Sequence, residues 1–310
     1  MHLETASKLE KIFKSGQLAV TSECGPPRSS DPTHIIEKGR LIKDYVDAVN
    51  ITDNQTSVTR ICSLAACIHL KNIGIEPVLQ MVTRDRNRIA LQSDLLGAAS
   101  FGIHNVLCLS GDHQSFGDHR QAQNVFDLDS MQLLQTVRHM REEGKFLSGD
   151  EIEVPPKFYV GAAANPFGDP FKIRVPRLAK KVAAGAEFIQ TQCIYNMDRF
   201  EKWMEEVRDR GLDEQVNIMA GITPMRSVGM AKYMKRAVPG MDVPEDLIDR
   251  LSGVEKKRQS QEGIDIAVEQ IQRLKEIKGV AGFHVMAIEW EEKVPEIVER
   301  AGLYPRPKVD

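Results

Sequence analysis

The chain has 310 residues, of which 42% are hydrophobic and 27% are charged, a composition typical of a folded globular protein. The formal net charge of -3 gives no electrostatic basis for binding nucleic acid or a membrane surface. No apolar run approaches the ~20 residues that span a bilayer, and residues 1–4 lack the basic start and apolar core of a signal peptide.

Strand-like and helix-like segments alternate along the chain. The apolar pattern predicts strands at residues 19–24, 47–52, 77–82, 105–110, 157–163, 187–192, 217–220 and 279–286. Helical spacing predicts helices at residues 6–15, 31–45, from the loop 53–57 through 70, 89–101, from 130 onward, around 178–182 with an end at 185, 197–208, 226–236, 244–276 with an interruption near 252–253, and 291–301.

Eight strands, each followed by a helix at intervals of roughly 30 residues, indicate a (β/α)8 TIM barrel. No linker or change in composition divides the chain, so we expect a single domain over residues 1–310. A doubly wound sheet is the competing architecture. It usually has fewer strands and a glycine fingerprint after the first strand, and no G-x-G-x-x-G or P-loop motif opens any helix.

The cysteine and histidine residues show no metal-site spacing. The five cysteines are an odd number without a CxxC pair, and the eight histidines form no HxH or HxxxH cluster. We therefore expect no disulfide framework, no metal ion and a reducing cytoplasmic setting.

The active site of a (β/α)8 barrel lies at the carboxyl ends of its strands. Any one polar residue there, taken alone, is more often a solvated loop residue or a helix cap than part of an active site. As a set, however, carboxylates and amides converge on one mouth. The residues at the expected strand ends are Glu23, Thr52, Gln80, Asp112, Asn165, Gln192, Thr223 and Glu289.

Glu23 has the best-defined local setting. It ends the first strand, and Gly25, Pro26 and Pro27 stop that strand, because proline lacks the N–H group that a ladder needs. Apolar surroundings disfavour the charged form of a carboxyl group. We therefore expect Glu23 to hold a proton near neutral pH and to act as a general acid.

Two further features suit a ligand. Asp112 follows Ser110 and Gly111, and glycine lets the backbone approach a ligand closely, so Asp112 is placed to address a heterocycle. Lys180 and Lys181 lie on the helix after the fifth strand. A phosphate-bearing cofactor and a solvated helix face explain these lysines equally well.

The connection 113–129 is unusually long. Such loops are usually functional or disordered, and Val125 and Phe126 would be unusual in a disordered segment. We expect a functional loop. It is rich in aspartate, with Asp118, Asp127 and Asp129.

Short motifs, in their order along residues 15–300, resemble those of the methylenetetrahydrofolate reductases, which are flavin-dependent (β/α)8 barrels. These motifs are Glu23 before Pro26-Pro27-Arg28, Asn50-Ile51-Thr52-Asp53, Leu109-Ser110-Gly111-Asp112, Lys180-Lys181-Val182-Ala183-Ala184-Gly185-Ala186, Thr191-Gln192 and Gly221-Ile222-Thr223-Pro224. Residues 83–87 and 111–130 look most like the branch of acetogens and some archaea, in which the reductase is often one subunit of an electron-transferring complex.

The resemblance implies a role for each matching residue. Glu23 would protonate N10 of methylenetetrahydrofolate, Asp112 would lie between flavin and pterin, and Gln192 would bind the folate. Reduced flavin would pass a hydride to the one-carbon unit and yield 5-methyltetrahydrofolate. The positions that would hold the flavin, either FAD or FMN, are Thr52, Gln80, Ser110, Gly111, Asp112, Phe126, Asp127, Asn165 and Lys181.

The sequence departs from the family pattern near the flavin. Cys24 and Gly25 stand where many members have two aromatics, Gln80 replaces a histidine, and Val228 replaces an aromatic. We therefore expect a partner subunit, rather than direct use of NAD(P)H, to supply electrons. The chain would be such a subunit or a homo-oligomer.

Two other functions are compatible with a polar barrel mouth. A pterin-binding methyltransferase barrel would hold folate at the same mouth without a flavin and pass its methyl group to a corrinoid. A scaffold subunit would have lost the chemistry. The presence of Glu23, Asp112 and Gln192 together argues against the scaffold.

Overall fold

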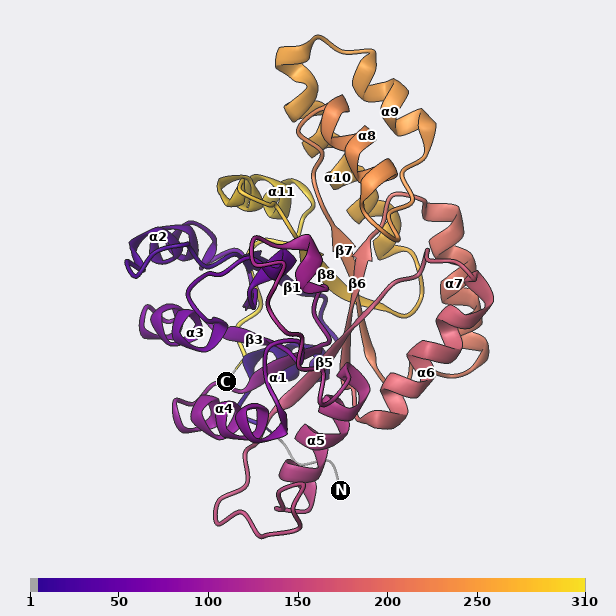
Figure 1. The fold of residues 1–310 in the computed structure, drawn as a ribbon. Coiled ribbons are helices and arrows are strands. Elements are labelled where there is room, and N and C mark those ends of the chain that lie inside the picture. The colour runs from indigo at the N-terminus through magenta and orange to yellow at the C-terminus, as the bar shows by residue number, and fades with distance from the viewer. Residues whose placement is uncertain (1–4, 310) are drawn as a thin grey trace.

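The structure is a computed structural model that describes residues 5–309. Eight parallel strands form a closed barrel in chain order, and β8 pairs with β1 (Figure 1). The (β/α)8 barrel predicted from the sequence is therefore confirmed. The strands are β1 (Ala19–Cys24), β2 (Ala48–Ile51), β3 (Pro77–Val82), β4 (Asn105–Leu109), β5 (Tyr159–Ala164), β6 (Phe188–Cys193), β7 (Asn217–Ile222) and β8 (Val280–Val285).

Helices surround the barrel, because parallel strands need both faces covered. The surrounding helices are α2 (Thr33–Ile42), α3 (Ser63–Asn72), α4 (Arg88–Ser100), α5 (Ser130–Glu142), α6 (Arg174–Ala184), α7 (Met197–Asp209), α10 (Gln259–Lys275) and α11 (Val294–Arg300). Between β7 and α10, helices α8 (Val228–Ala237) and α9 (Glu245–Ser252) stand out from the barrel at the top of Figure 1. They pack on an apolar cluster of their own that includes Met234 and Leu251.

Several helix boundaries differ from the sequence prediction. The helix predicted to open from the loop 53–57 begins later, at Ser63. Within that loop, Thr56 and Ser57 adopt positive φ angles of 54° and 60° in the short turn η1 (Gln55–Ser57). The helix predicted to contain residues 178–182 and to end at Gly185 is α6, which begins at Arg174 and has Gly185 as its C-cap. The interruption predicted near residues 252–253 is confirmed, because α9 ends at Ser252 and the turn η4 (Lys256–Arg258) leads into α10.

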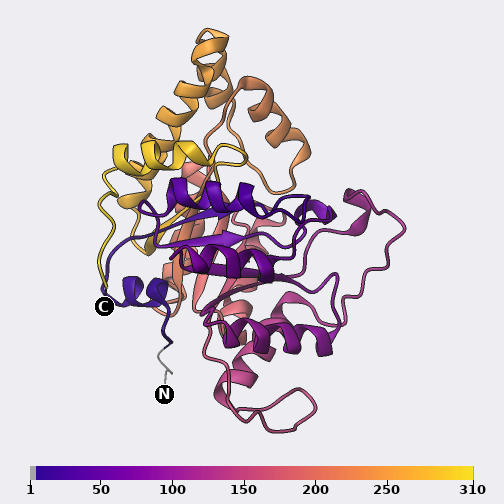
Figure 2. The ribbon, with the colours of Figure 1, turned by 90° about the vertical axis from the view of Figure 1, so that its left-hand side faces the viewer.

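Helix α1 (Lys8–Lys14) closes the amino end of the barrel. Its Leu9, Ile12 and Phe13 pack in one cluster with inward-facing strand residues such as Tyr159 and Phe188. In Figure 2, α1 lies at the left end of the strands, and the connection after β4 lies at the right end. The open end of the barrel is thus the carboxyl end.

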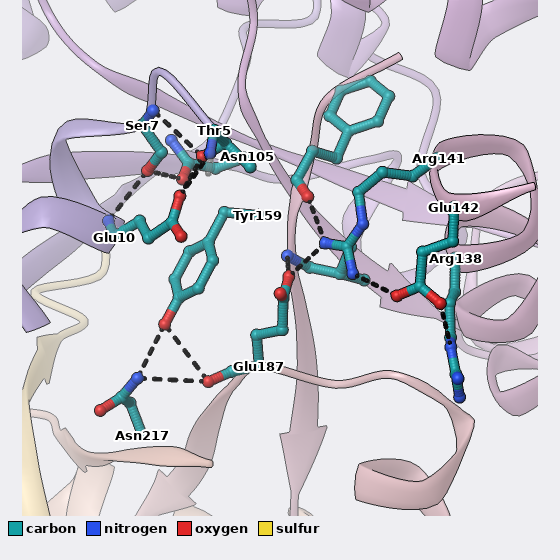
Figure 3. Close-up of polar contacts among 12 residues, drawn as sticks. Thr5, Ser7, Glu10, Asn105, Arg138, Arg141, Glu142, Tyr159, Glu187 and Asn217 are labelled. Carbon is teal, nitrogen blue, oxygen red and sulfur yellow. Dashed lines mark hydrogen bonds and ion pairs between the residues drawn. The ribbon is translucent and has the colours of Figure 1, made fainter. Parts of the chain in front are cut away.

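Polar contacts fix this closed end (Figure 3). The Ser7 hydroxyl donates to Asn105 Oδ1 at 2.6 Å, which ties α1 to β4. Between the starts of β7 and β5, Asn217 Nδ2 donates to the Tyr159 hydroxyl at 2.8 Å, and that hydroxyl donates to the Glu187 carbonyl. These residues lie opposite the candidate site, so we assign them to the stability of the barrel.

Candidate active site

Three adjoining cavities lie at the carboxyl end of the barrel. The largest has a volume of about 360 Å³, the second about 280 Å³ and the third about 20 Å³. Among the described residues, Glu23 alone lines all three. Its side chain is only 15% exposed, so the carboxyl group faces the cavities rather than bulk solvent.

Two nitrogen atoms face one oxygen of Glu23. Gln80 on β3 donates from Nε2 to Glu23 Oε2 at 3.1 Å, and Nε2 of His284 on β8 is 3.9 Å from the same oxygen. Both partners are almost fully buried. Glu23 is therefore hydrogen-bonded from β3 and faced by a ring nitrogen from β8.

Beneath Glu23, the interior of the barrel is polar. The Thr21 hydroxyl is 2.8 Å from His284 Nδ1, and the side-chain amides of Asn50 and Gln190 form two hydrogen bonds with each other. The sequence analysis missed these four residues. A usable signal was the two-residue period of a strand, since Thr21 and Gln190 come two positions before Glu23 and Gln192 and so share their face.

The largest of the three cavities is lined by five of the predicted residues, Glu23, Gln80, Asn165, Lys181 and Gln192. Lys181 Nζ donates to the carbonyl of Ala163, near the end of β5, at 2.5 Å. Burial is the main cause that lowers the pKa of Lys181, and the nearby charge of Arg177 lowers it further. Because Arg174 and Arg177 also line this cavity, α6 brings three cations to it.

The second cavity contains Thr52, Gln80, Ser110, Gly111 and Asp112. The Thr52 hydroxyl is buried and has no hydrogen-bond partner among the described residues. Gly111 has a φ of +86°, a conformation that favours glycine. Asp112 is exposed, and its Oδ2 accepts the N–H of Thr56 at 3.2 Å. The structure thus brings Glu23 and Asp112 to one cavity.

Phe126 and Asp127 are not among the residues that line these cavities. Asp127 accepts three hydrogen bonds from Arg88, through its backbone N–H, Nε and Nη2. These bonds lower the pKa of Asp127 to about 2. Phe126 is partly exposed and has a φ of +40°. The structure thus places this pair outside the three cavities.

Two other strand-end residues have structural partners. Thr223 Oγ1 lies 2.9 Å from the thiol of Cys193. Glu289 forms an ion pair with Lys38 at 2.8 Å, and the hydrogen bond from Lys38 lowers the pKa of Glu289.

The long connection after β4 packs beside the mouth. A side chain at Gly117 would collide with the Ser57 carbonyl, so this glycine allows the turn η2 (Gln114–Phe116) to lie against η1. Arg28, which follows the Gly-Pro-Pro stop, forms an ion pair with Asp118 at 2.6 Å. The connection is therefore tied to the loops after β1 and β2.

Within residues 5–309, no group of three or more His, Cys, Asp or Glu side chains is arranged to hold a metal ion. Nor does any helix in that range combine the length and apolar character needed to cross a membrane.

The closed barrel and its polar mouth define a class, that of (β/α)8 barrels with ionisable groups gathered at the carboxyl ends of the strands. Within this class, the sequence model described as methylenetetrahydrofolate reductase matches residues 8–302. The chain belongs to the methylenetetrahydrofolate reductase family.

Relatives of known annotation are longer than this chain. Methylenetetrahydrofolate reductase 2 of Schizosaccharomyces pombe is 28% identical over 257 residues, which are 77% of this chain and 36% of the relative. A probable methylenetetrahydrofolate reductase (NADPH) of Caenorhabditis elegans is 24% identical and covers 96% of this chain but 44% of the relative. Methylenetetrahydrofolate reductase (NADH) 1 of Arabidopsis thaliana is 24% identical, with 99% and 52% covered. The chain thus spans about a third to a half of these proteins.

A solved structure has the same fold. It is an uncharacterized protein from Clostridium thermocellum, described as binding two copies of 5-methyl-5,6,7,8-tetrahydrofolic acid. The TM-score is 0.62 over 95% of this chain and 98% of that one, at 15% sequence identity. At this identity the likeness supports the barrel fold alone.

Proposed function

We propose that this chain uses a bound flavin to reduce 5,10-methylenetetrahydrofolate to 5-methyltetrahydrofolate. The observation that carries the proposal is the placement of Glu23, a largely buried carboxyl group shared by all three cavities at the barrel mouth. Membership of the reductase family supports the choice of substrate.

Glu23 is the proposed acid for the substrate. Protonation of N10 opens the five-membered ring of methylenetetrahydrofolate and leaves an electrophilic carbon on N5, which accepts a hydride to become the methyl group. Gln80 holds Oε2 of Glu23 at 3.1 Å, which fixes the direction of the carboxyl group. Asp112 and Gln192 line the cavities on either side of Glu23, where they would bind the pterin.

The residues present fit a flavin nucleotide. When bound, the flavin supplies the hydride. The unpartnered hydroxyl of Thr52, together with Gln80, Ser110, Gly111 and Asp112, offers hydrogen bonds in the second cavity. Lys181 and Arg177 bring positive charge to the largest cavity, beside Asn165, as a phosphate group requires. For Phe126 and Asp127 the flavin role stays a prediction from resemblance.

Electron supply is a separate part of the proposal. We propose that a partner subunit passes electrons to the flavin in the cytoplasm, either to a single copy or to a homo-oligomer of this chain. NADH and NADPH are the competing donors, since the longer relatives carry their names. Rapid flavin reduction when NADH alone is added to the isolated chain would contradict the proposal that a partner subunit supplies the electrons.

The test follows the flavin spectrum. The purified protein should show the visible absorbance of oxidised flavin, lose it on anaerobic reduction, and regain it when methylenetetrahydrofolate is added. Glu23→Gln should bleach normally with an artificial donor but fail to reoxidise with the folate. A colourless protein that passes a methyl group to a corrinoid would instead support a methyltransferase.

A further inference from the structure

His284 lies beneath the proposed acid and is 3% exposed. Its Nε2 is 3.9 Å from Glu23 Oε2, the same oxygen that accepts from Gln80. What His284 can do for Glu23 depends on which ring nitrogen carries the proton. The neighbours of the other nitrogen, Nδ1, decide this.

Gln190 and Asn50 form a reciprocal amide pair. Asn50 Nδ2 donates to Gln190 Oε1 at 2.7 Å, and Gln190 Nε2 donates to Asn50 Oδ1 at 3.0 Å. The NH₂ group of Gln190 has a second hydrogen. Nε2 lies 3.2 Å from Thr21 Oγ1 and 3.4 Å from His284 Nδ1, so this hydrogen points at them.

Gln190 thereby selects one tautomer of His284. An amide NH₂ group only donates, so a proton on Nδ1 would face another N–H group 3.4 Å away. The Thr21 hydroxyl accepts from Gln190 and turns its own hydrogen to Nδ1, 2.8 Å away. Nδ1 is thus an acceptor, and neutral His284 carries its proton on Nε2, on the side of Glu23.

We propose that His284 is a positioning residue for Glu23, held as the Nε2–H tautomer by Thr21 and Gln190. The proposal rests on the proposed function. With the N–H groups of Gln80 and His284 facing Oε2, the transferable proton is carried by Oε1. In the step, the Oε1–H bond of Glu23 breaks and the N10–H bond of the folate forms.

His284 keeps its own proton in this step. The separation of 3.9 Å from Oε2 is too long for a hydrogen bond, so the ring acts electrostatically on the charge that Glu23 acquires. Burial of the ring strengthens this electrostatic effect, because it lowers the local dielectric constant.

Nitrogen-15 NMR of the full-length protein, labelled in histidine, reads the tautomer without catalysis. His284→Gln identifies the signal by its loss. The Nε2–H form is expected in the native protein and in Thr21→Ser, which keeps the hydroxyl. Thr21→Val removes the hydroxyl and is expected to give a mixture of tautomers. An Nδ1–H form in the native protein would overturn the proposal.

The kinetic test uses the same matched pair. Reoxidation by methylenetetrahydrofolate should slow about tenfold in Thr21→Val, the effect of losing one weak polar interaction, and should be nearly unchanged in Thr21→Ser. Flavin reduction by an artificial donor should be equal in both. His284→Gln, which retains an N–H group, should stay more active than His284→Leu. Equal reoxidation rates within either pair would overturn the proposal.

The two readouts separate the two proposals. A native protein with the Nε2–H tautomer but no reduction of methylenetetrahydrofolate refutes the proposed function and supports the arrangement around His284. A protein that reduces the folate but carries the Nδ1–H tautomer supports the function and refutes the positioning role.

Discussion

Asp53 anchors the loop after β2 through a buried ion pair. Its side chain is 0% exposed, and Oδ2 accepts from Arg86 Nη1 at 2.7 Å and from the Val82 N–H at 2.9 Å. Arg86 also pairs with Asp94 at 2.8 Å. Burial alone lowers the pKa of Arg86, but the two carboxylates outweigh burial and raise it. Asp53→Ala would therefore leave the largely buried Arg86 with Asp94 as its one carboxylate partner, and the Val82 N–H group unsatisfied.

Removing one partner of a buried charge pair costs about 3–5 kcal/mol. Because Arg86 keeps its ion pair with Asp94, we expect the lower value, about 3 kcal/mol, for Asp53→Ala. Asp94 is 37% exposed. Removing the Asp94 carboxylate, the other partner of the Arg86 guanidinium, should lower the free energy of unfolding by at most about 1 kcal/mol, as is usual for an exposed pair. Asp94→Ala is thus the matched control.

The assay is urea unfolding of the native chain and both variants, with the free energy of unfolding extrapolated to water. Because Asp53 and Thr52 line the same cavity, Asp53→Ala should also retain less flavin than Asp94→Ala. Equal destabilisation by the two variants would refute the reasoning, since burial would then not decide the strength of these pairs. Adding Arg86→Ala should recover part of the loss, because no unpaired cation remains.

Three further outcomes are expected. Lys181→Met should weaken flavin retention about tenfold, measured by equilibrium dialysis, whereas Lys180→Met on the exposed face should not, and equal losses would argue against a phosphate site. Hydrogen bonds from Arg88 lower the pKa of Asp127 to about 2 from 3.8, so the stability they add is present above pH 3.8 and lost as the pH falls toward 2. Thermal unfolding from pH 5 to 2 should show a smaller acid loss in Arg88→Gln, and an unchanged pH profile would contradict this. Phe13→Ala should cost about 3 kcal/mol in urea, because the ring is 8% exposed within the closed end of the barrel, yet leave flavin reoxidation unchanged. A slower reoxidation would show that the closed end influences the site.

Local pattern was enough to predict the strands. Residues 77–82 match β3 at both ends, and 19–24 match β1. A strand is predicted by a run of apolar residues bounded by glycine, proline or polar turns. This pattern lies within a few neighbouring residues, so no distant contact is needed to recognise it. The regular alternation with helices then left a (β/α)8 barrel as the simplest closed arrangement.

Helix starts were harder because tertiary contacts fix them. Thr56 and Ser57 carry polar side chains suited to a helix N-cap, yet both adopt positive φ angles. Gly117, distant in sequence, packs against the Ser57 carbonyl, and Asp112 accepts the Thr56 N–H. Because these partners are distant in the chain, the local helix propensity of Thr56 and Ser57 does not reveal them.

The sequence by itself determined the barrel and placed Glu23, Gln80, Asp112 and Gln192 at strand ends, because a strand end is a local property. Only the tertiary structure decided which of these side chains meet. The pairing of β1 with β8 brings His284 to Thr21 across 263 positions of chain and sets its ring below Glu23. That contact depends on the register in which the barrel closes, and register is a relation between strands that no single segment encodes.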